Sequence, residues 1–302
     1  MRPSLVAGGV VCVVIALLGA VFAVSGGQKG GGRDPSGNVV GVSSAGRPQR
    51  DEPHVPSPVG PRQLASDINR AQAAIDDAAS SSGDLAEAAL LEQVATGALE
   101  REAPRARAGT LALLRPQAAA TMRTDLAASA ALSRLTVPRR RFPPWRIAQP
   151  PSPGTLLGYF RGAQSRFGVG WQYLAAIEFI ETRFGRVHGP STADAQGPMQ
   201  FLPATWARYG SGNIDNQRDA IAAAARYLVA NGAPGDMATA LYHYNPSTDY
   251  VAAVQDYAAR MRADPRAYDG YYNWQVLFAR VGGLFILPVG YPRVRPEPVH
   301  YP

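Results

Sequence analysis

The chain of 302 residues contains a single cysteine, Cys12, and a single lysine, Lys29. One cysteine cannot form an internal disulfide, so a packed core must stabilise the folded part. The four histidines are far apart in the sequence, and there is no HExxH motif. Zinc sites usually combine closely spaced histidine or cysteine ligands. We therefore expect no metal site and no cofactor.

Other common functional signatures are also missing. The sequence has no GxSxG motif, and it has no glycine-rich phosphate loop that ends in Lys-Ser or Lys-Thr. It also lacks a nucleic-acid recognition motif, although its formal net charge is +7 and nearly all its basic residues are arginine. We therefore expect no nucleic-acid partner. The positive charge suits a surface near anionic lipid or anionic cell-wall polymer, and equally a solvated surface without a partner.

One long apolar run is present near the N-terminus. Residues 5 to 24, LVAGGVVCVVIALLGAVFAV, carry no charge, and about 20 apolar residues span a bilayer as a helix. Arg2 precedes the run and is expected on the cytoplasmic side. We therefore predict a single-pass transmembrane signal-anchor at residues 1–25, with the rest of the chain outside the cytoplasm. Cleavage near Ala20 or Ala23, followed by secretion, is the alternative.

Composition divides the rest of the chain into five segments. Residues 26–62 are rich in glycine, serine and proline and predict a disordered linker. Residues 63–135 have small apolar residues at helical spacing and predict an alanine-rich helical arm, which forms a hairpin, packs on the next domain or stays partly mobile. Residues 136–154 form a proline-rich connector. Helical periods dominate residues 155–262, and residues 263–302 form an aromatic extension expected to pack against those helices.

Helix start and stop signals are clear within residues 155–262. Gly185 is placed to end a helix in the left-handed conformation after Phe184, and Pro203 is placed to begin the next one. Asp215 or Asn216 can cap a third helix, which ends near residue 231. Two more helices are expected at about residues 237–244 and 248–261. This segment is therefore predicted to be a compact all-α domain.

Two glutamates lie in the first of these helices. In AAIEFIETRFG, residues 175 to 185, Glu178 and Glu181 are three residues apart and share one face of an otherwise apolar helix. A carboxyl group on such a face is paired, is neutral or takes part in chemistry. For Glu178 we favour a structural or pairing role over that of a second catalytic carboxylate.

Three sequence blocks follow one another in this segment. They are IETRFG at residues 180–185, AQGPMQFLPATW at 195–206 and ALYHYNPSTDYV at 240–251. In this order they resemble the Glu-Ser/Thr, G-x-M-Q-x-x-P-x-T and Tyr-Asn blocks of the lytic transglycosylase family. The resemblance covers roughly residues 155–262. It implies a lysozyme-like helical catalytic domain of the goose-type lysozyme class.

The resemblance also implies roles for individual residues. Glu181, followed by Thr182, matches the catalytic glutamate. The positions that match substrate-binding residues of the family are Ser191, Met199, Gln200, Phe201, Tyr244 and Asn245. Ser191 and Gln200 can alternatively serve to tie down the loop through backbone hydrogen bonds.

The reaction implied by the resemblance breaks the glycosidic bond after N-acetylmuramic acid in the glycan strands of peptidoglycan. A protonated Glu181, with a pKa raised by burial, would donate its proton to the leaving oxygen. The resulting carboxylate would then take the proton of the C6 hydroxyl of the sugar. This hydroxyl closes onto C1 and gives a 1,6-anhydro product without water. The acetamido group of the substrate would stabilise the intermediate, so a second carboxylate is not required.

Two alternatives remain at this point. A hydrolytic muramidase would use Glu178, Asp194 or Asp249 as a second carboxylate and would leave a reducing end. A noncatalytic wall-binding scaffold would depend on the helical arm and the aromatic extension, and it would not need Glu181. The sequence identifies no protein partner in cell division or wall synthesis.

Overall fold

The computed structural model describes residues 60–136, 139–281 and 283–299. The predicted membrane anchor at residues 1–25 and all but the end of the predicted linker lie outside these residues. In the described part of the chain, no helix has both the length and the apolar character needed to cross a membrane. Most of these residues are helical, which confirms the predicted α-helical class.

The N-terminal part of the described chain, hereafter the arm, consists of four helices. They are α1 (Pro61–Asp76), α2 (Ser82–Arg101), α3 (Pro104–Ala112) and α4 (Pro116–Arg134). Helix α1 stops at Asp76, and Ala79 beyond it is exposed. A capping box between Ser81 and Asp84 instead begins α2, since each side chain accepts a hydrogen bond from the backbone of the other.

The following part, hereafter the body, contains the helices expected from the sequence and one more at each end. They are α5 (Pro153–Phe167), α6 (Trp171–Thr182), α7 (Pro203–Tyr209), α8 (Gln217–Ala230), α9 (Met237–Tyr244), α10 (Thr248–Ala263) and α11 (Arg266–Asn273). The predicted start at Pro203 and the predicted cap at Asn216 are confirmed, and the Asn216 side chain accepts a hydrogen bond from the backbone of Asp219. Helix α6 ends two residues before the predicted end at Phe184.

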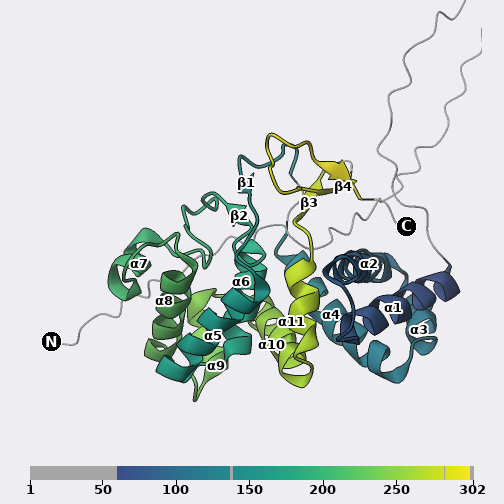
Figure 1. Ribbon diagram of the computed structural model, residues 1–302, viewed down its shortest axis with the longest axis horizontal. Helices are drawn as coiled ribbons and strands as arrows, with labels where there is room; N and C mark the ends of the chain where they lie inside the picture. The colour runs from purple at the N-terminus through teal and green to yellow at the C-terminus, as the bar shows by residue number, and fades with distance from the viewer. Residues whose placement is uncertain (1–59, 137–138, 282, 300–302) are drawn as a thin grey trace, which may run out of the picture.

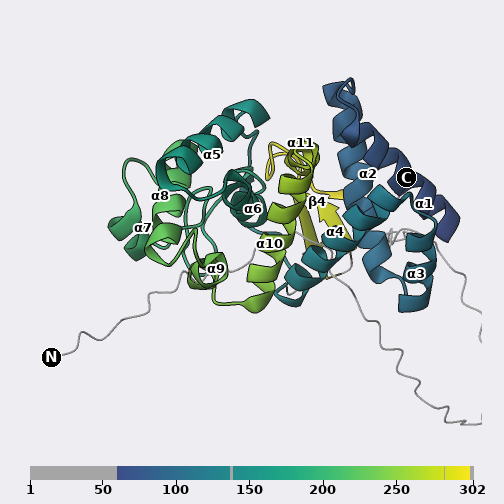
Figure 2. The same cartoon turned by 90° about the horizontal axis from the view of Figure 1, so that it is seen from below.

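The arm and the body share one hydrophobic core. In Figures 1 and 2 the arm forms one end of the molecule and α5 to α9 form the other, with α10 and α11 between them. Helix α4 packs against α10, while α1 and α2 pack against α11. Ala128 and Leu132 of α4 are buried in the same cluster as Phe179 of α6. The arm therefore packs on the body, which was one of the three arrangements expected.

A buried polar network also joins the arm to the body. Arg260 of α10 forms ion pairs with Asp125 of α4 at 2.6 Å and with Glu92 of α2 at 3.2 Å. The indole of Trp274 donates to Glu92 at 3.0 Å, and the hydroxyl of Tyr271 donates to Asp125. All of these side chains are at most 5% exposed. A buried arginine between two carboxylates holds α2, α4 and α10 in one arrangement.

Two small sheets lie along one edge of the helices. Strand β1 (Arg146–Ile147) pairs antiparallel with β2 (Val187–His188), and β3 (Leu277–Arg280), β4 (Gly283–Ile286) and β5 (Glu297–Pro298) form a second antiparallel sheet. Figure 1 shows β1, β3 and β4 together on this edge. These strands were not predicted from the sequence, because each is only two to four residues long and β1 and β2 pair across about 40 residues of chain.

Candidate active site

Helix α6 places both candidate glutamates in the interior. Every residue from Leu174 to Thr182 is buried, and Glu178 and Glu181 are each 0% exposed. The helix lies across the core of the body, so the polar face expected of a surface helix is absent from this stretch. The carboxyl groups therefore depend on other elements for hydrogen bonds.

The hydroxyl of Tyr250 supplies a hydrogen bond to Glu181. It donates to Oε1 of Glu181 at 2.8 Å from the first turn of α10. The ring of Tyr250 lies parallel to that of Tyr244, with 6.4 Å between centroids and 3° between planes. The hydroxyl of Tyr244 in turn donates to the carbonyl oxygen of Met199 at 2.6 Å. The three sequence blocks thus converge on one place, although they are separated by up to about 60 residues along the chain.

The chain turns sharply immediately after Glu181. Arg183, Phe184 and Gly185 have φ angles of 53°, 59° and 77°, so three successive residues are left-handed. The sequence predicts this conformation for Gly185 alone. Packing explains the other two, because the guanidinium of Arg183 lies 4.1 Å from the ring centroid of Phe179, and Phe184 is fully buried among aromatic rings. Left-handed Arg and Phe are strained, and tertiary contacts must hold them there.

Backbone strain is concentrated around this site. In the described chain, the non-glycine residues with positive φ are Arg183, Phe184, Asp194 and Gln200. All four lie between the end of α6 and the start of α7. Strained residues of this kind are enriched at functional sites, where the surrounding structure stabilises a backbone conformation that is unfavourable by itself.

The loop between α6 and α7 is fixed by its own hydrogen bonds. The backbone amides of Ala193 and Ala195 donate to Oγ of Ser191, each at 3.1 Å. Gln196 and Phe201 exchange two backbone hydrogen bonds at 2.9 Å, and the side-chain amide of Gln200 donates to the carbonyl of Gly197 at 3.0 Å. The interpretation of Ser191 and Gln200 as loop-fixing residues thus has direct contacts in its favour.

Thr182 joins the end of α6 to this loop. Its hydroxyl donates to the carbonyl oxygen of Pro198 at 2.6 Å and accepts a hydrogen bond from the backbone of Gly185 at 3.0 Å. Met199 and Phe201 follow Pro198 and are fully buried, and the ring of Phe201 contacts Trp206 and Tyr244. The loop that carries four of the predicted site residues is thereby held against the helix that carries Glu181.

The remaining predicted residues lie in different surroundings. Asn245 is 6% exposed and directly follows α9, where its backbone amide caps the helix by donating to Leu241. Asp194 is exposed on a turn of the loop. Asp249 forms an ion pair with Arg134 of the arm at 2.6 Å, and this hydrogen bond lowers the pKa of Asp249. Asp249 is therefore engaged with the arm rather than with α6.

Glu178 is buried in a very different way from Glu181. Neither of its carboxyl oxygens has a hydrogen-bond partner among the described residues. Burial raises the pKa of Glu178 well above its usual value, because a charged carboxylate would lose its hydration without compensation. The nearby Glu178 also contributes to the raised pKa of Tyr268. Burial therefore favours the protonated form of Glu178.

A hollow of about 240 Å³ lies next to the end of α6. Its walls come from the residues after α6, from β2, from the following loop and from the start of α8. The residues that line it are Gly185, Val187, His188, Gly189, Pro190, Gln196, Gly197, Pro198, Asp215 and Gln217. Glu181 does not line this hollow, but Pro198 and Gly185 do, and both bond to Thr182 beside it.

The polar groups of the hollow are mostly hydrogen-bond acceptors. Oε1 of Gln217 is buried and has no hydrogen-bond partner in the described chain, and Asp215 adds a carboxylate. Burial, and then the neighbouring Arg146, lower the pKa of His188, so its imidazole is neutral at physiological pH. The hollow therefore suits a ligand with hydroxyl or amide N–H donors and without a negative charge.

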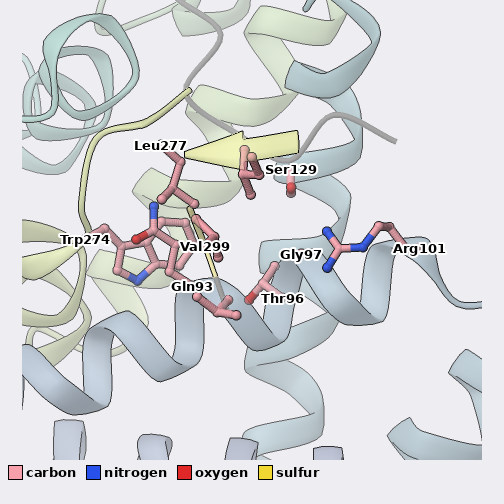
Figure 3. A pocket seen from close by; sticks show the side chains of 10 residues that line it. Gln93, Thr96, Gly97, Arg101, Ser129, Trp274, Leu277 and Val299 are labelled. Carbon is pink, nitrogen blue, oxygen red and sulfur yellow. The ribbon is translucent and has the colours of Figure 1, made fainter. Parts of the chain in front are cut away.

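A second pocket lies between the arm and the C-terminal strands. Figure 3 shows Gln93, Thr96 and Arg101 of α2 on one side of it and Trp274 and Leu277 on another. Its free volume of about 10 Å³ is room for roughly one water molecule. It is therefore a packing defect between elements and not a ligand site.

Two features of the site were missed by sequence reasoning. Tyr250 belongs to the third block and lies in the helix that follows Tyr244 and Asn245, but only the chain fold shows that its hydroxyl reaches Glu181. The hollow beside α6 joins Asp215 and Gln217 to His188, which are almost 30 residues apart in sequence. In the described ranges, no group of three or more His, Cys, Asp or Glu side chains is placed to hold a metal ion.

Comparisons with protein-family models, with curated proteins and with solved structures gave no match. The activity of the chain must therefore be inferred from its own residues and their geometry.

Proposed function

We propose that this protein is a lytic transglycosylase that cleaves the glycan strands of peptidoglycan, with Glu181 as both acid and base and with a lysozyme-like catalytic domain. One observation carries most of the weight. Glu181 is a buried glutamate at the end of a core helix. Hydrogen bonds that involve Tyr250, Met199 and Thr182 join the three sequence blocks that resemble the family around this helix end.

Burial makes Glu181 suited to act first as an acid. A carboxyl group that is fully withdrawn from water is held in its protonated form more readily than an exposed one. In the proposed reaction its proton passes to the glycosidic oxygen as the C1–O bond breaks. The carboxylate then accepts the proton of the C6 hydroxyl while the C6 oxygen bonds to C1. The proton lost in the first step is thus regained in the second.

Tyr250 positions the acid in this scheme. Its hydroxyl donates to Oε1 of Glu181 and so fixes the orientation of the carboxyl group. A donor to the carboxylate also stabilises the charged state that follows proton donation. Loss of this hydrogen bond should therefore slow the reaction without preventing it.

The hollow beside α6 supports a sugar substrate. N-acetylated amino sugars are uncharged at their ring hydroxyls and amide, and these groups can supply the donor that Oε1 of Gln217 lacks, while Asp215 adds a further acceptor. Since Glu181 itself is 0% exposed, a glycan in the hollow reaches it only when the loop between α6 and α7 shifts. The proposal thus includes opening of this loop on substrate binding.

The proposed location is the outer face of the cell membrane, with residues 1–25 as the anchor. These residues lie outside the part of the chain that the structure describes. Secretion after cleavage of the N-terminal segment is the alternative location.

Mass spectrometry of muropeptides released from purified peptidoglycan tests the proposal. The full-length protein should release products with 1,6-anhydromuramyl ends, and the Glu181→Gln protein, shown to be folded by circular dichroism, should not. Reducing-end products would instead identify a hydrolytic muramidase. An absence of products that depend on Glu181 would favour the noncatalytic scaffold.

A further inference from the structure

The small strands at the edge of the molecule form a distinct surface, which we call the β-layer and define as residues 139–149, 276–281 and 283–299. The two segments are joined by backbone hydrogen bonds between Arg139 and Ala279, and between Ile147 and both Gly290 and Tyr291. They share a hydrophobic cluster of their own. The buried members of that cluster from these segments are Ile147, Val276, Phe278, Leu287 and Tyr291.

Basic residues are concentrated in the β-layer. It contains seven arginines and a single acidic residue, Glu297, whereas the whole chain has 30 basic and 23 acidic residues. The arginines are Arg139, Arg140, Arg141, Arg146, Arg280, Arg293 and Arg295. All except Arg280 are exposed. In the described ranges none of the seven forms an ion pair with a carboxylate, so no acidic side chain neutralises their positive charge.

Arg280 is the exception in its packing. Its guanidinium lies 5.0 Å from the ring centroid of Phe142 and 5.9 Å from that of Phe285. Its Nε donates to the carbonyl oxygen of Arg140 at 3.3 Å. This packing joins the first basic segment to the hairpin of β3 and β4, so Arg139, Arg140 and Arg280 lie side by side.

Exposed apolar side chains accompany these arginines. Val281, Val289 and Val294 are 53%, 47% and 44% exposed. They are three of the six large hydrophobic side chains that are exposed in the described chain. Val281 follows Arg280, and Val294 lies between Arg293 and Arg295. Apolar side chains flanked by arginines are typical of surfaces that meet the headgroup region of a bilayer.

We propose that the β-layer is a docking surface for anionic phospholipid membrane. Arginines near a bilayer are attracted to negatively charged headgroups, while valines gain by leaving water for the boundary of the acyl chains. A soluble polyanion would engage the arginines but would leave the three valines in water. The combination of both residue types therefore favours a lipid surface over an anionic polymer. This inference does not depend on the proposed catalytic activity.

Docking would also orient the hollow beside α6. Strand β1 of the β-layer pairs with β2, so that Arg146 lies opposite His188 in the sheet, and His188 lines the hollow. A β-layer in contact with lipid therefore places the mouth of the hollow close to the membrane surface.

A local probe is needed to test this, since the apolar run at residues 5–24 is itself expected to partition into lipid. An environment-sensitive fluorophore is attached to Val289→Cys in the full-length Cys12→Ser protein, which is then incorporated into vesicles. A matched control carries the fluorophore at Leu113→Cys on the arm, because Leu113 is 49% exposed, close to the 47% of Val289. Emission and quenching by aqueous iodide are compared between phosphatidylcholine vesicles and vesicles that also contain phosphatidylglycerol.

The expected result is a blue shift and several-fold weaker quenching at position 289 with phosphatidylglycerol only, and no change at position 113. Charge reversal by Arg293→Glu and Arg295→Glu should reduce this protection roughly tenfold or more, since each basic residue near an anionic surface contributes about a fivefold effect. Reversal at the exposed arm residues Arg105 and Arg123 should leave it unchanged. Val294→Ser should weaken it further.

Three results would overturn the inference. One is equal quenching in the two lipid compositions, and another is protection that survives the reversal at Arg293 and Arg295. The third is the same blue shift with soluble poly(glycerol phosphate) at equal phosphate concentration and no effect of Val294→Ser. That result would assign the β-layer to an anionic polymer instead.

Discussion

The molecule buries two sets of acidic side chains, and the two sets differ in their ion-pair and hydrogen-bond partners. Between the arm and the body, Glu92 and Asp125 form ion pairs with Arg260 and accept hydrogen bonds from Trp274 and Tyr271. In α6, Glu178 has no hydrogen-bond partner among the described residues, and Glu181 accepts a hydrogen bond from the neutral hydroxyl of Tyr250.

The contrast separates a structural site from a candidate catalytic one. The carboxylates of the first set are held in place by a cation and neutral donors, although burial still raises the pKa of Asp125 to about 7. The two glutamates of α6 form no ion pair with a basic side chain among the salt bridges of the described residues. Among the described residues, the non-glycine positions with positive φ lie beside the second set. The first set therefore joins the arm to the body, and the second set forms the candidate active site at the end of α6.

The largest effect on stability is expected from Arg260→Met. Removing the guanidinium leaves Glu92 and Asp125 buried without a cation, which costs about 3–5 kcal/mol in the free energy of unfolding. Urea denaturation followed by circular dichroism measures this change. If Arg260→Met loses less than about 1 kcal/mol, the network does not hold the arm on the body.

Glu178→Gln should change how stability depends on pH. The raised pKa means that the folded state keeps the proton of Glu178 above the usual value of 4.5 while the unfolded state loses it. The wild type is therefore destabilised as pH rises above about 4.5, by up to about 1.4 kcal/mol per pH unit from this group. Glutamine does not titrate, so the variant should become more stable relative to the wild type between pH 5 and pH 8.

Thermal unfolding at several pH values within that range checks this expectation. Parallel melting-temperature curves for the wild type and the Gln variant would mean that Glu178 is ionised in the folded protein.

Tyr250→Phe should affect activity more than stability. Loss of a hydrogen bond to a reacting carboxyl group costs about 1.5–3 kcal/mol in the transition state, which corresponds to a rate roughly 10 to 100 times lower. Tyr227→Phe is a matched control, because its hydroxyl also donates inside the body, to the carbonyl of His243 at 2.7 Å. Muropeptide release should fall for the first variant and stay near the wild-type rate for the second. Equal rates for the two variants would remove Tyr250 from the site.

The smallest effect is expected from Arg134→Met. Its ion pair with Asp249 also joins the arm to α10, but the Arg134 side chain is 59% exposed. Exposed pairs contribute less than about 1 kcal/mol and are weakened by salt. Urea denaturation at low and high salt should therefore show a small, salt-dependent loss. If Arg134→Met lost as much unfolding free energy as Arg260→Met, the exposed ion pair would stabilise the protein as much as the buried one.

The helices were the most predictable part of the fold. Pro203, Asn216 and Gly185 act locally, and the structure has a helix start, a cap and a left-handed residue at these positions. The strands of the β-layer were not predictable, because short runs such as Arg146–Ile147 become strands only through pairing with distant segments. Left-handed Arg183 was also not predictable, since its guanidinium packs 5.7 Å from the ring centroid of Trp274, which is distant in sequence.

The candidate site was predictable in its residues and not in its contacts. Two glutamates on an apolar helix face already required that each be paired, neutral or reactive, and both are buried. The pattern could not show that Glu178 lacks a partner or that Tyr250 contacts Glu181, because both depend on how α10 crosses α6. The buried carboxylates of the arm pair with Arg260, and this contact too depends on how the arm packs on the body.

The most direct test of the central claim compares the two glutamates of α6 in the same assay. Initial rates of anhydromuropeptide release are measured by mass spectrometry for the wild type, Glu181→Gln and Glu178→Gln, after thermal unfolding has shown that each protein is folded. We predict a rate at least about 100-fold lower for Glu181→Gln, as expected for loss of a general acid and base, and less than a tenfold change for Glu178→Gln. An active Glu181→Gln protein beside an inactive Glu178→Gln protein would contradict the assignment of Glu181 as the catalytic residue.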